Sequence, residues 1–178
     1  MQKRVAFLMC SVLMLSVFAA AQTGKEKQRP SPAANAQCKF ADGKSIKVAY
    51  SSPRAKGRKI YGGLVPFGEV WRTGANEATT FVTDANLTIG GKDIPAGNYT
   101  MFTVPNQDKW QLVISKKTGE WGIPYPEGED LARADMSVSK TSAPVENFTI
   151  SFHEMGTGCH MYIDWESTRA TVEITEKK

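Results

Sequence analysis

The feature that most limits what this chain can fold into is a short-range alternation of apolar and polar side chains. In residues 147–152, Phe148, Ile150 and Phe152 alternate with polar neighbours, and the same two-residue period returns at residues 161–165. A period of two places successive side chains on opposite faces of an extended strand, whereas an amphipathic helix needs a period of 3.6. The alternation therefore predicts β-strands that each bury one face.

Turn signals divide much of the chain into similar short segments. Asp42 and Gly43 precede an alternating run at residues 45–51, and Gly90 and Gly91 connect two short apolar runs as a hairpin. Short strands at this close spacing are typical of sandwiches and small barrels. We therefore predict an all-β fold, a single antiparallel β-sandwich or small barrel of about nine short strands with one long glycine-rich loop.

Three local patterns add detail to this fold. Residues 98–104 place apolar side chains on both faces, which is typical of a central strand covered on both sides. A helix-like pattern is confined to residues 129–134, and a turn at Ser167 precedes the last expected strand. We expect the folded domain to span residues 37–176.

The N-terminus has the layout of a secretory signal peptide. A short basic start precedes an apolar run at residues 5–20, and Ala19 and Ala21 supply the small-x-small pattern that signal peptidase recognises. We therefore expect residues 1–21 to be removed and the mature protein to be exported, either to the periplasm or out of the cell. No later apolar run is long enough to span a membrane.

The segment after the signal peptide, residues 22–36, contains no large apolar side chain. Such a segment cannot offset its ordering entropy by burial, so we expect a flexible tether. The formal net charge of the whole chain is +4, and removing Lys3 and Arg4 with the signal peptide lowers it by two. Because the remaining charge is weak and evenly spread, no nucleic-acid partner is expected.

Cys38 and Cys159 are the two cysteines left after the signal peptide is removed. An even count in an exported protein favours one disulfide, and two buried free thiols are the alternative. Residues 153–161 also bring two histidines and two methionines close to Cys159, a composition found at copper and zinc sites. Strand alternation, however, directs Cys159 and Met161 to one face and His160 to the other. We expect no cofactor and no bound metal, with a weak surface site at the two histidines as the alternative.

The long segment at residues 53–78 is the exception to the alternation, because it is rich in glycine and has no clear period. Connections of this length in a compact domain are usually functional or form packed loops. Its polar and aromatic side chains make up the candidate ligand site. They are Arg58, Tyr61, Trp71, Arg72, Asn76 and Glu77, and a second aromatic loop at residues 121–126 contributes Trp121.

Part of this segment carries a recognisable signature. Residues 71–78 read Trp-Arg-Thr-Gly-Ala-Asn-Glu-Ala, and they follow a Gly-Arg pair at residues 57–58 and the run Gly-Gly-Leu-Val-Pro at residues 62–66. Together with Pro-Ala-Gly-Asn-Tyr at residues 95–99 and Trp-Gly at residues 121–122, this pattern resembles bacterial domain-of-unknown-function family 2911. The resemblance covers roughly residues 31–175. It implies an exported bacterial protein with one β-rich domain and no established substrate or cofactor.

The chemistry of the long segment suits an anion or a polyol. Arg72 can hold a carboxylate or phosphate with two hydrogen bonds, and Asn76 and Glu77 can orient such a ligand. Tyr61 and Trp71 can stack on a sugar ring or an aliphatic chain. The alternative is structural: Trp71 closes one end of the fold, Arg72 pairs with Glu77, and Asn76 caps backbone groups.

Three classes of function are compatible with these residues. The favoured hypothesis is a non-catalytic binding module for a small anionic or glycan ligand or an envelope partner. The others are a structural module of the envelope and a carboxylate-type hydrolase or lyase that uses Glu77 with a second acid. Trp121 and its proline-rich neighbours form either a stacking platform or a lid on the core. The sequence has no phosphate-binding glycine loop and no nucleophile elbow, so we expect a binding module rather than an enzyme.

Overall fold

A computed structural model describes residues 29–178 of the chain, and the predicted signal peptide lies outside the described residues. Nine strands and no helix form in this range. The strands are β1 (Ala33–Lys39), β2 (Ser45–Ser51), β3 (Thr79–Thr83), β4 (Leu87–Ile89), β5 (Lys92–Ile94), β6 (Gly97–Val104), β7 (Lys109–Ser115), β8 (Asp130–Met155) and β9 (Gly158–Glu176).

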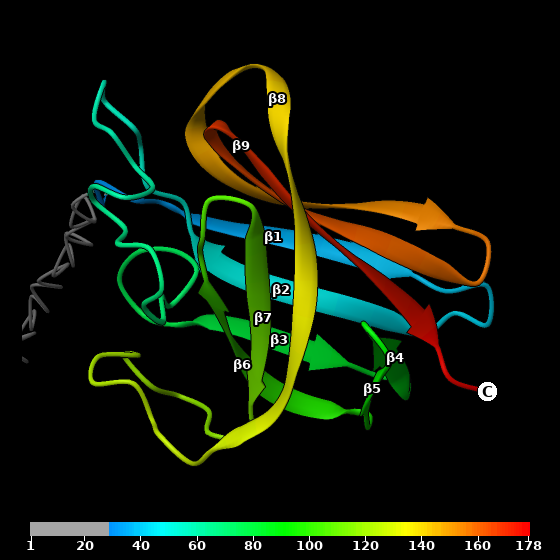
Figure 1. The fold of residues 1–178 in the computed structure, drawn as a ribbon. Helices are drawn as coiled ribbons and strands as arrows, with labels where there is room; N and C mark the ends of the chain where they lie inside the picture. The colour runs from blue at the N-terminus through cyan, green and yellow to red at the C-terminus, as the bar shows by residue number, and fades with distance from the viewer. Residues whose placement is uncertain (1–28) are drawn as a thin grey trace, which may run out of the picture.

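The nine strands form one antiparallel sheet in the order β1-β2-β3-β6-β7-β8-β9-β4-β5. The predicted all-β, antiparallel fold is therefore confirmed, and the hairpin at Gly90 and Gly91 is confirmed as β4 and β5. Figure 1 shows how the long β8 and β9 bend and carry their distal hairpin across β1 and β2. The core lies inside this bend.

The bend in β8 and β9 coincides with two interruptions of their register. Lys140 pairs with Thr168, but the next pairs are Val145 with Glu166 and then Thr149 with Asp164, so β8 contains extra residues at each step. Extra residues of this kind are β-bulges, which bend a strand and increase its twist. As a result, β8 can pair with β7 near its start and still reach β2 near its end.

Hydrogen bonds fix the bent part of β8 against the end of β2. The amide of Phe148 donates to the Pro53 carbonyl (2.9 Å), and the amide of Ala55 donates to the Glu146 carbonyl (2.8 Å). The Ser52 hydroxyl adds a third bond, to the Phe148 carbonyl (2.7 Å). The long segment that follows β2 is thereby held beside the bend.

Two strand predictions at the C-terminal side were wrong in detail. The helix-like pattern at residues 129–134 lies almost entirely in β8, where Ala132 and Ala134 pair with Ile114 and Leu112 of β7. Pairing with a buried neighbour therefore overrides the local pattern. The predicted turn at Ser167 does not form, because β9 continues through this point with Glu166 at a positive φ of 54° in the bulge.

The N-terminal boundary also differs from the expected one. β1 begins at Ala33, so residues 33–36, which were expected to end the tether, pair with β2 instead. Ala34 and Ala36 of this stretch are partly buried and pack against the main core, whereas Ala33 and Asn35 are exposed. Because the inward-facing residues are alanines, a search for large apolar side chains does not find this strand.

β6 is covered on both faces, as predicted. On its inner face it contributes Met101 to the main core, which includes Phe81, Trp110, Phe148 and Trp165. On its outer face Phe102 and Val104 form a second, small cluster with Ala78 and Val113, and Val70 and Tyr125 pack on it. This outer cover comes from the two long connections of the chain, so the same loops that carry the candidate site also complete the core.

Candidate functional site

The β2–β3 connection, residues 52–78, is pinned to the sheet at Trp71. The Trp71 amide donates to the Thr103 carbonyl (2.8 Å) and the Thr103 amide donates back to the Trp71 carbonyl (2.9 Å). The Thr73 and Thr103 hydroxyls lie 3.1 Å apart in the interior beside this bridge. Trp71 and the residue after it therefore have fixed positions although they belong to a loop.

Trp71 is part of an aromatic cluster at the bend of the sheet. Its ring is nearly parallel to that of Trp165, with 6.0 Å between centroids, and meets Phe148 edge-on at 5.1 Å. Tyr61 contacts the other side of the cluster, 4.7 Å from the ring of Trp110. The indole nitrogen of Trp165 donates to the Glu146 carbonyl (3.2 Å), so this tryptophan is fixed at both ends.

A cavity of about 360 Å³ opens in front of this cluster. This volume is within the usual range for small-molecule sites. Its lining comes from four separate parts of the chain, and the polar side chains in it are two arginines and a serine. The lining residues are Ser31, Pro53, Arg58, Leu64, Val65, Trp71, Arg72, Gly74, Ala75, Ile123 and Trp165.

Arg72 lines this cavity, and its guanidinium contains an unusual polar atom. Its Nη1 is buried and has no hydrogen-bond acceptor among residues 29–178. The guanidinium lies over the ring of Trp121, 5.4 Å from the centroid. Gly122 permits this approach because it has a φ of +85°, and a Cβ there would lie only 3.1 Å from the Arg72 Cβ.

Arg58 reaches the same cavity from the other side. Its Nε donates to the Ala55 carbonyl (3.0 Å) and its Nη2 to the Arg54 carbonyl (2.6 Å). These bonds orient the guanidinium but leave its charge without a carboxylate partner. Among the described residues neither Arg58 nor Arg72 forms a salt bridge, and both charged side chains that line the cavity are positive. The charge of Arg72 also acts on Glu77 at longer range and helps to lower its pKa.

Comparison with known proteins adds the family. A family described as a protein of unknown function, DUF2911, matches residues 31–174, which is most of the chain. The chain belongs to this family. No curated protein and no solved structure matches it.

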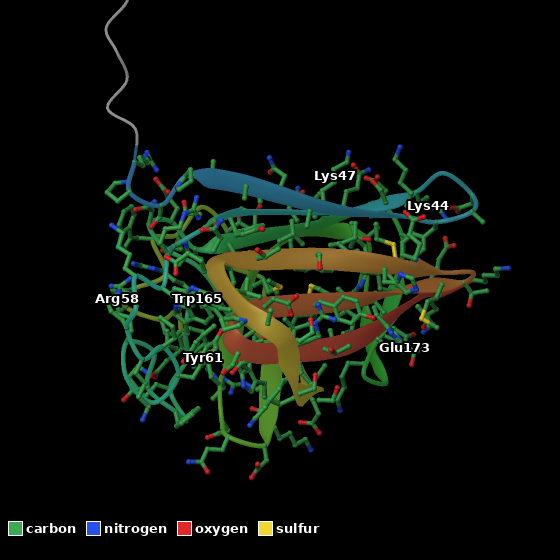
Figure 2. All side chains as sticks on the ribbon, turned by 90° about the horizontal axis from the view of Figure 1, so that it is seen from above. Lys44, Lys47, Arg58, Tyr61, Trp165 and Glu173 are labelled. Atoms are coloured by element: carbon green, nitrogen blue, oxygen red, sulfur yellow. A yellow bond between two sulfur atoms is a disulfide. The ribbon has the colours of Figure 1, made fainter. Side chains whose placement is uncertain are left out.

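The predicted site residues of this DUF2911 chain fall into two groups. Arg58, Trp71 and Arg72 line the cavity, and Trp121 contacts Arg72 at its edge. Figure 2 shows Arg58, Tyr61 and Trp165 gathered at one end of the molecule. Tyr61 itself is buried behind Trp71, and its hydroxyl is a second buried polar atom without a partner in the described part of the chain.

Asn76 and Glu77 are not brought to the cavity. The Asn76 amide donates to the Ser31 carbonyl (3.2 Å) and the Ser51 hydroxyl (3.1 Å), and its φ of 58° marks a tight turn. Glu77 is exposed and pairs with Arg29 (2.9 Å) rather than with Arg72. Its pKa is lowered, first by a hydrogen bond from its own backbone and then by Arg29. Asn76 therefore has the backbone contact that the structural alternative described, whereas the pair between Arg72 and Glu77 that it also described does not form.

Several apolar lining residues, among them Leu64, Ile123 and Trp165, were not predicted from the sequence. Trp165 was visible only as an alternating core position of a strand, and Ile123 as a member of the proline-rich loop. Nothing in the sequence indicates that these positions line one cavity, because they are far apart in the chain and only the tertiary fold brings them together. The one available signal for the site was that Ile123, a large apolar residue, lies in a proline-rich loop rather than in an alternating strand.

The cysteine prediction is confirmed, because Cys38 of β1 and Cys159 of β9 form a disulfide with 6.5 Å between their Cα atoms. Cys159 and Met161 are both buried while His160 is partly exposed, as alternation requires. In the part of the chain that the structure describes, no three His, Cys, Asp or Glu side chains gather in a group suited to a metal ion. Nor does any helix within residues 29–178 have the length and apolarity needed to cross a membrane.

Proposed function

We propose that this protein is an exported, non-catalytic binding module that holds a small anionic ligand in the cavity between Arg58 and Arg72. The observation that carries the proposal is the buried, unpartnered Nη1 of Arg72. A buried charged donor without an acceptor costs more free energy than a neutral one, since hydrogen bonds to ions are the stronger ones. A ligand carboxylate or phosphate in the cavity balances the charge of this guanidinium and gives it a charge-assisted bond.

The composition of the cavity favours an anion over a glycan. Sugar hydroxyls need both donors and acceptors, and the side chains that usually supply acceptors are Asp, Glu, Asn and Gln. None of these lines the cavity, whose charged side chains are both arginines. An anion, by contrast, uses donors alone, and arginine can present two of them in parallel.

The same composition favours binding over carboxylate catalysis. A carboxylate-type hydrolase needs two acids that flank the bond to be cleaved. Glu77, the acid considered for this role, is exposed and paired with Arg29 away from the cavity. Export is supported by the expected signal peptide and by the disulfide, since stable disulfides belong to oxidising compartments.

A ligand screen on the parent and two variants tests the proposal. We expect a carboxylate or phosphate ester at about a hundred times its Kd to stabilise the fold by about 2.7 kcal/mol, which is a rise in Tm of about 5–10 °C for a domain of this size. The Arg72→Met variant should lose this response. Lys59→Met removes the same charge from an exposed position of the same connection and should keep it.

Two results would contradict the proposal. One is an Arg72→Met variant that responds to anions as the parent does. The other is a parent that responds to no anion in a panel of carboxylates, phosphate esters and sulfate esters, or that responds equally to uncharged sugars.

A further inference from the structure

The mouth of the cavity carries an unusual share of the exposed apolar surface. Within residues 29–178, four large hydrophobic side chains are exposed: Leu64 (49%), Trp121 (53%), Ile123 (67%) and Met155 (47%). Leu64 and Ile123 line the cavity, and Trp121 lies against Arg72 at its edge. Exposed apolar groups that cluster around a hollow are typical of a binding surface, whereas scattered ones need no explanation.

The cavity therefore has a charged part and an apolar part. Arg58 and Arg72 supply the charge, while the remaining lining is dominated by Leu64, Val65, Ile123 and the tryptophan pair. The volume of about 360 Å³ is about twelve times the roughly 30 Å³ that one water occupies in the liquid. An inorganic anion would fill only a fraction of this space and would leave the apolar lining in contact with water.

We infer that the ligand is an amphiphilic anion, with its acid group at Arg72 and an apolar chain along Leu64 and Ile123. This inference rests on the proposed function and specifies its ligand class. The two arginines hold the acid group, and the exposed side chains of Leu64 and Ile123 contact the apolar chain of the ligand. Burial of the chain against Ile123 removes from water the most exposed large apolar side chain at the site.

Calorimetry with a homologous series tests the inference directly. The probes are the straight-chain carboxylates from acetate to octanoate, with the matching alcohols as uncharged controls. We expect the affinity of the acids to rise about two- to four-fold for each added methylene until the chain fills the cavity. The alcohols, which lack the charge, should bind far more weakly at every length.

Two matched variants separate the contribution of the exposed apolar lining from that of the arginines. Ile123→Ser should flatten the dependence on chain length and leave the affinity for acetate unchanged. Met155→Ser removes another exposed apolar side chain, at the β8–β9 hairpin, which does not line the cavity, and should leave the whole series unchanged. A flattened series in both variants would overturn the inference.

The outcomes also distinguish failure of this inference from failure of the proposed anion-binding function. If acetate and octanoate bind equally well and Arg72→Met abolishes both, the cavity binds anions but no apolar chain, and only the inference is overturned. If no acid of any length binds, both fail.

A last arm identifies the source of the amphiphile. Phosphatidylcholine vesicles with and without phosphatidylglycerol are offered to the parent and to Arg72→Met. Sedimentation of the parent with the anionic vesicles alone, lost in Arg72→Met, assigns a membrane lipid. Binding of free octanoate without sedimentation assigns a dissolved ligand.

Discussion

The two ends of this molecule differ in how completely their residues are cross-linked and paired. At one end, β1 and the β8–β9 hairpin are joined by the Cys38–Cys159 disulfide, and Lys44 pairs with Glu176 (2.9 Å). At the other end the β2–β3 connection folds without regular strands and contains both Tyr61 and Arg72, whose buried polar atoms have no partner within residues 29–178. Figure 2 shows Lys44 and Tyr61 at these opposite ends.

The difference indicates that the two ends have different roles. In native structures nearly all buried polar groups form hydrogen bonds, so two buried groups without a partner in the same region need an explanation. Here both exceptions lie in one connection beside one cavity, while the disulfide end is cross-linked and paired. We infer that the disulfide end provides stability and that the cavity end gives up some stability for binding.

Loss of the disulfide should have the largest effect. The bridge closes a loop with a sequence separation of 121 residues, for which chain-entropy estimates give about 4–5 kcal/mol. Cys38→Ser combined with Cys159→Ser should therefore lower the free energy of unfolding by about this amount in urea titrations. Under conditions where the variant is folded, its affinity for the octanoate probe should match that of the parent. A weakened affinity would show that the two ends are coupled.

Two arginines provide the next comparison. Arg169 holds Asp164 with two hydrogen bonds (2.7 and 2.6 Å), and the Asp164 side chain is only 11% exposed. Arg169→Met leaves that carboxylate unpaired and should cost about 2 kcal/mol, between the values for exposed and buried pairs. Arg72→Met strands no carboxylate and should cost less than about 1 kcal/mol. Equal losses in chemical denaturation would refute the idea that Arg72 is held for a ligand.

Removing the hydroxyl group from each of two tyrosines should change the free energy of unfolding least, and in opposite directions. The Tyr50 hydroxyl accepts a hydrogen bond from the Ile150 amide (3.0 Å), so Tyr50→Phe should cost about 1 kcal/mol. The Tyr61 hydroxyl has no partner among the described residues, so Tyr61→Phe should raise the free energy of unfolding by about 1 kcal/mol. Thermal melts of both variants beside the parent check the signs. A loss in Tyr61→Phe would mean that its hydroxyl is satisfied in solution.

The pH dependence of stability offers a second readout of Tyr61. Burial, and then the negative charges of Asp164 and Glu166, raise the pKa of Tyr61 in the folded protein. The unfolded tyrosine ionises near pH 10, so above about pH 10 the unfolded state releases a proton that the folded state keeps. Stability should therefore fall as pH rises in this range, and it should fall less in Tyr61→Phe. Parallel slopes would contradict this assignment.

The sequence was sufficient for most of the strands and insufficient for the cavity, for a physical reason. A strand reveals itself through neighbouring residues, so Ile46, Phe148 and Ile163 are recognisable as buried positions from alternation alone. A cavity depends on which segments meet, and here Ile123 on a loop lines the same cavity as Trp165, which lies beside the bulged stretch of β8 and β9. Alternation contains no information on bulges of this kind.

The site residues illustrate the same limit at finer scale. Arg72 and Asn76 are four residues apart and looked equally suited to bind a ligand. The turn at Asn76 points its amide to Ser31 and Ser51, whereas Arg72 follows the bridge between Trp71 and Thr103 and lines the cavity. Residue type alone cannot separate these two outcomes, because the backbone decides which side chain faces open space.

The place of β9 in the sheet also has a consequence for how the chain reaches its native state. Leu87 at the start of β4 pairs with Glu176 at the end of β9, so the β4–β5 hairpin has no neighbouring strand until residues near the C-terminus are synthesised. Contacts between residues so far apart in the chain form late and slow the search for the native topology. Chains truncated before β9 should therefore remain protease-sensitive and open to chaperones, because the β4–β5 hairpin then has no strand beside it.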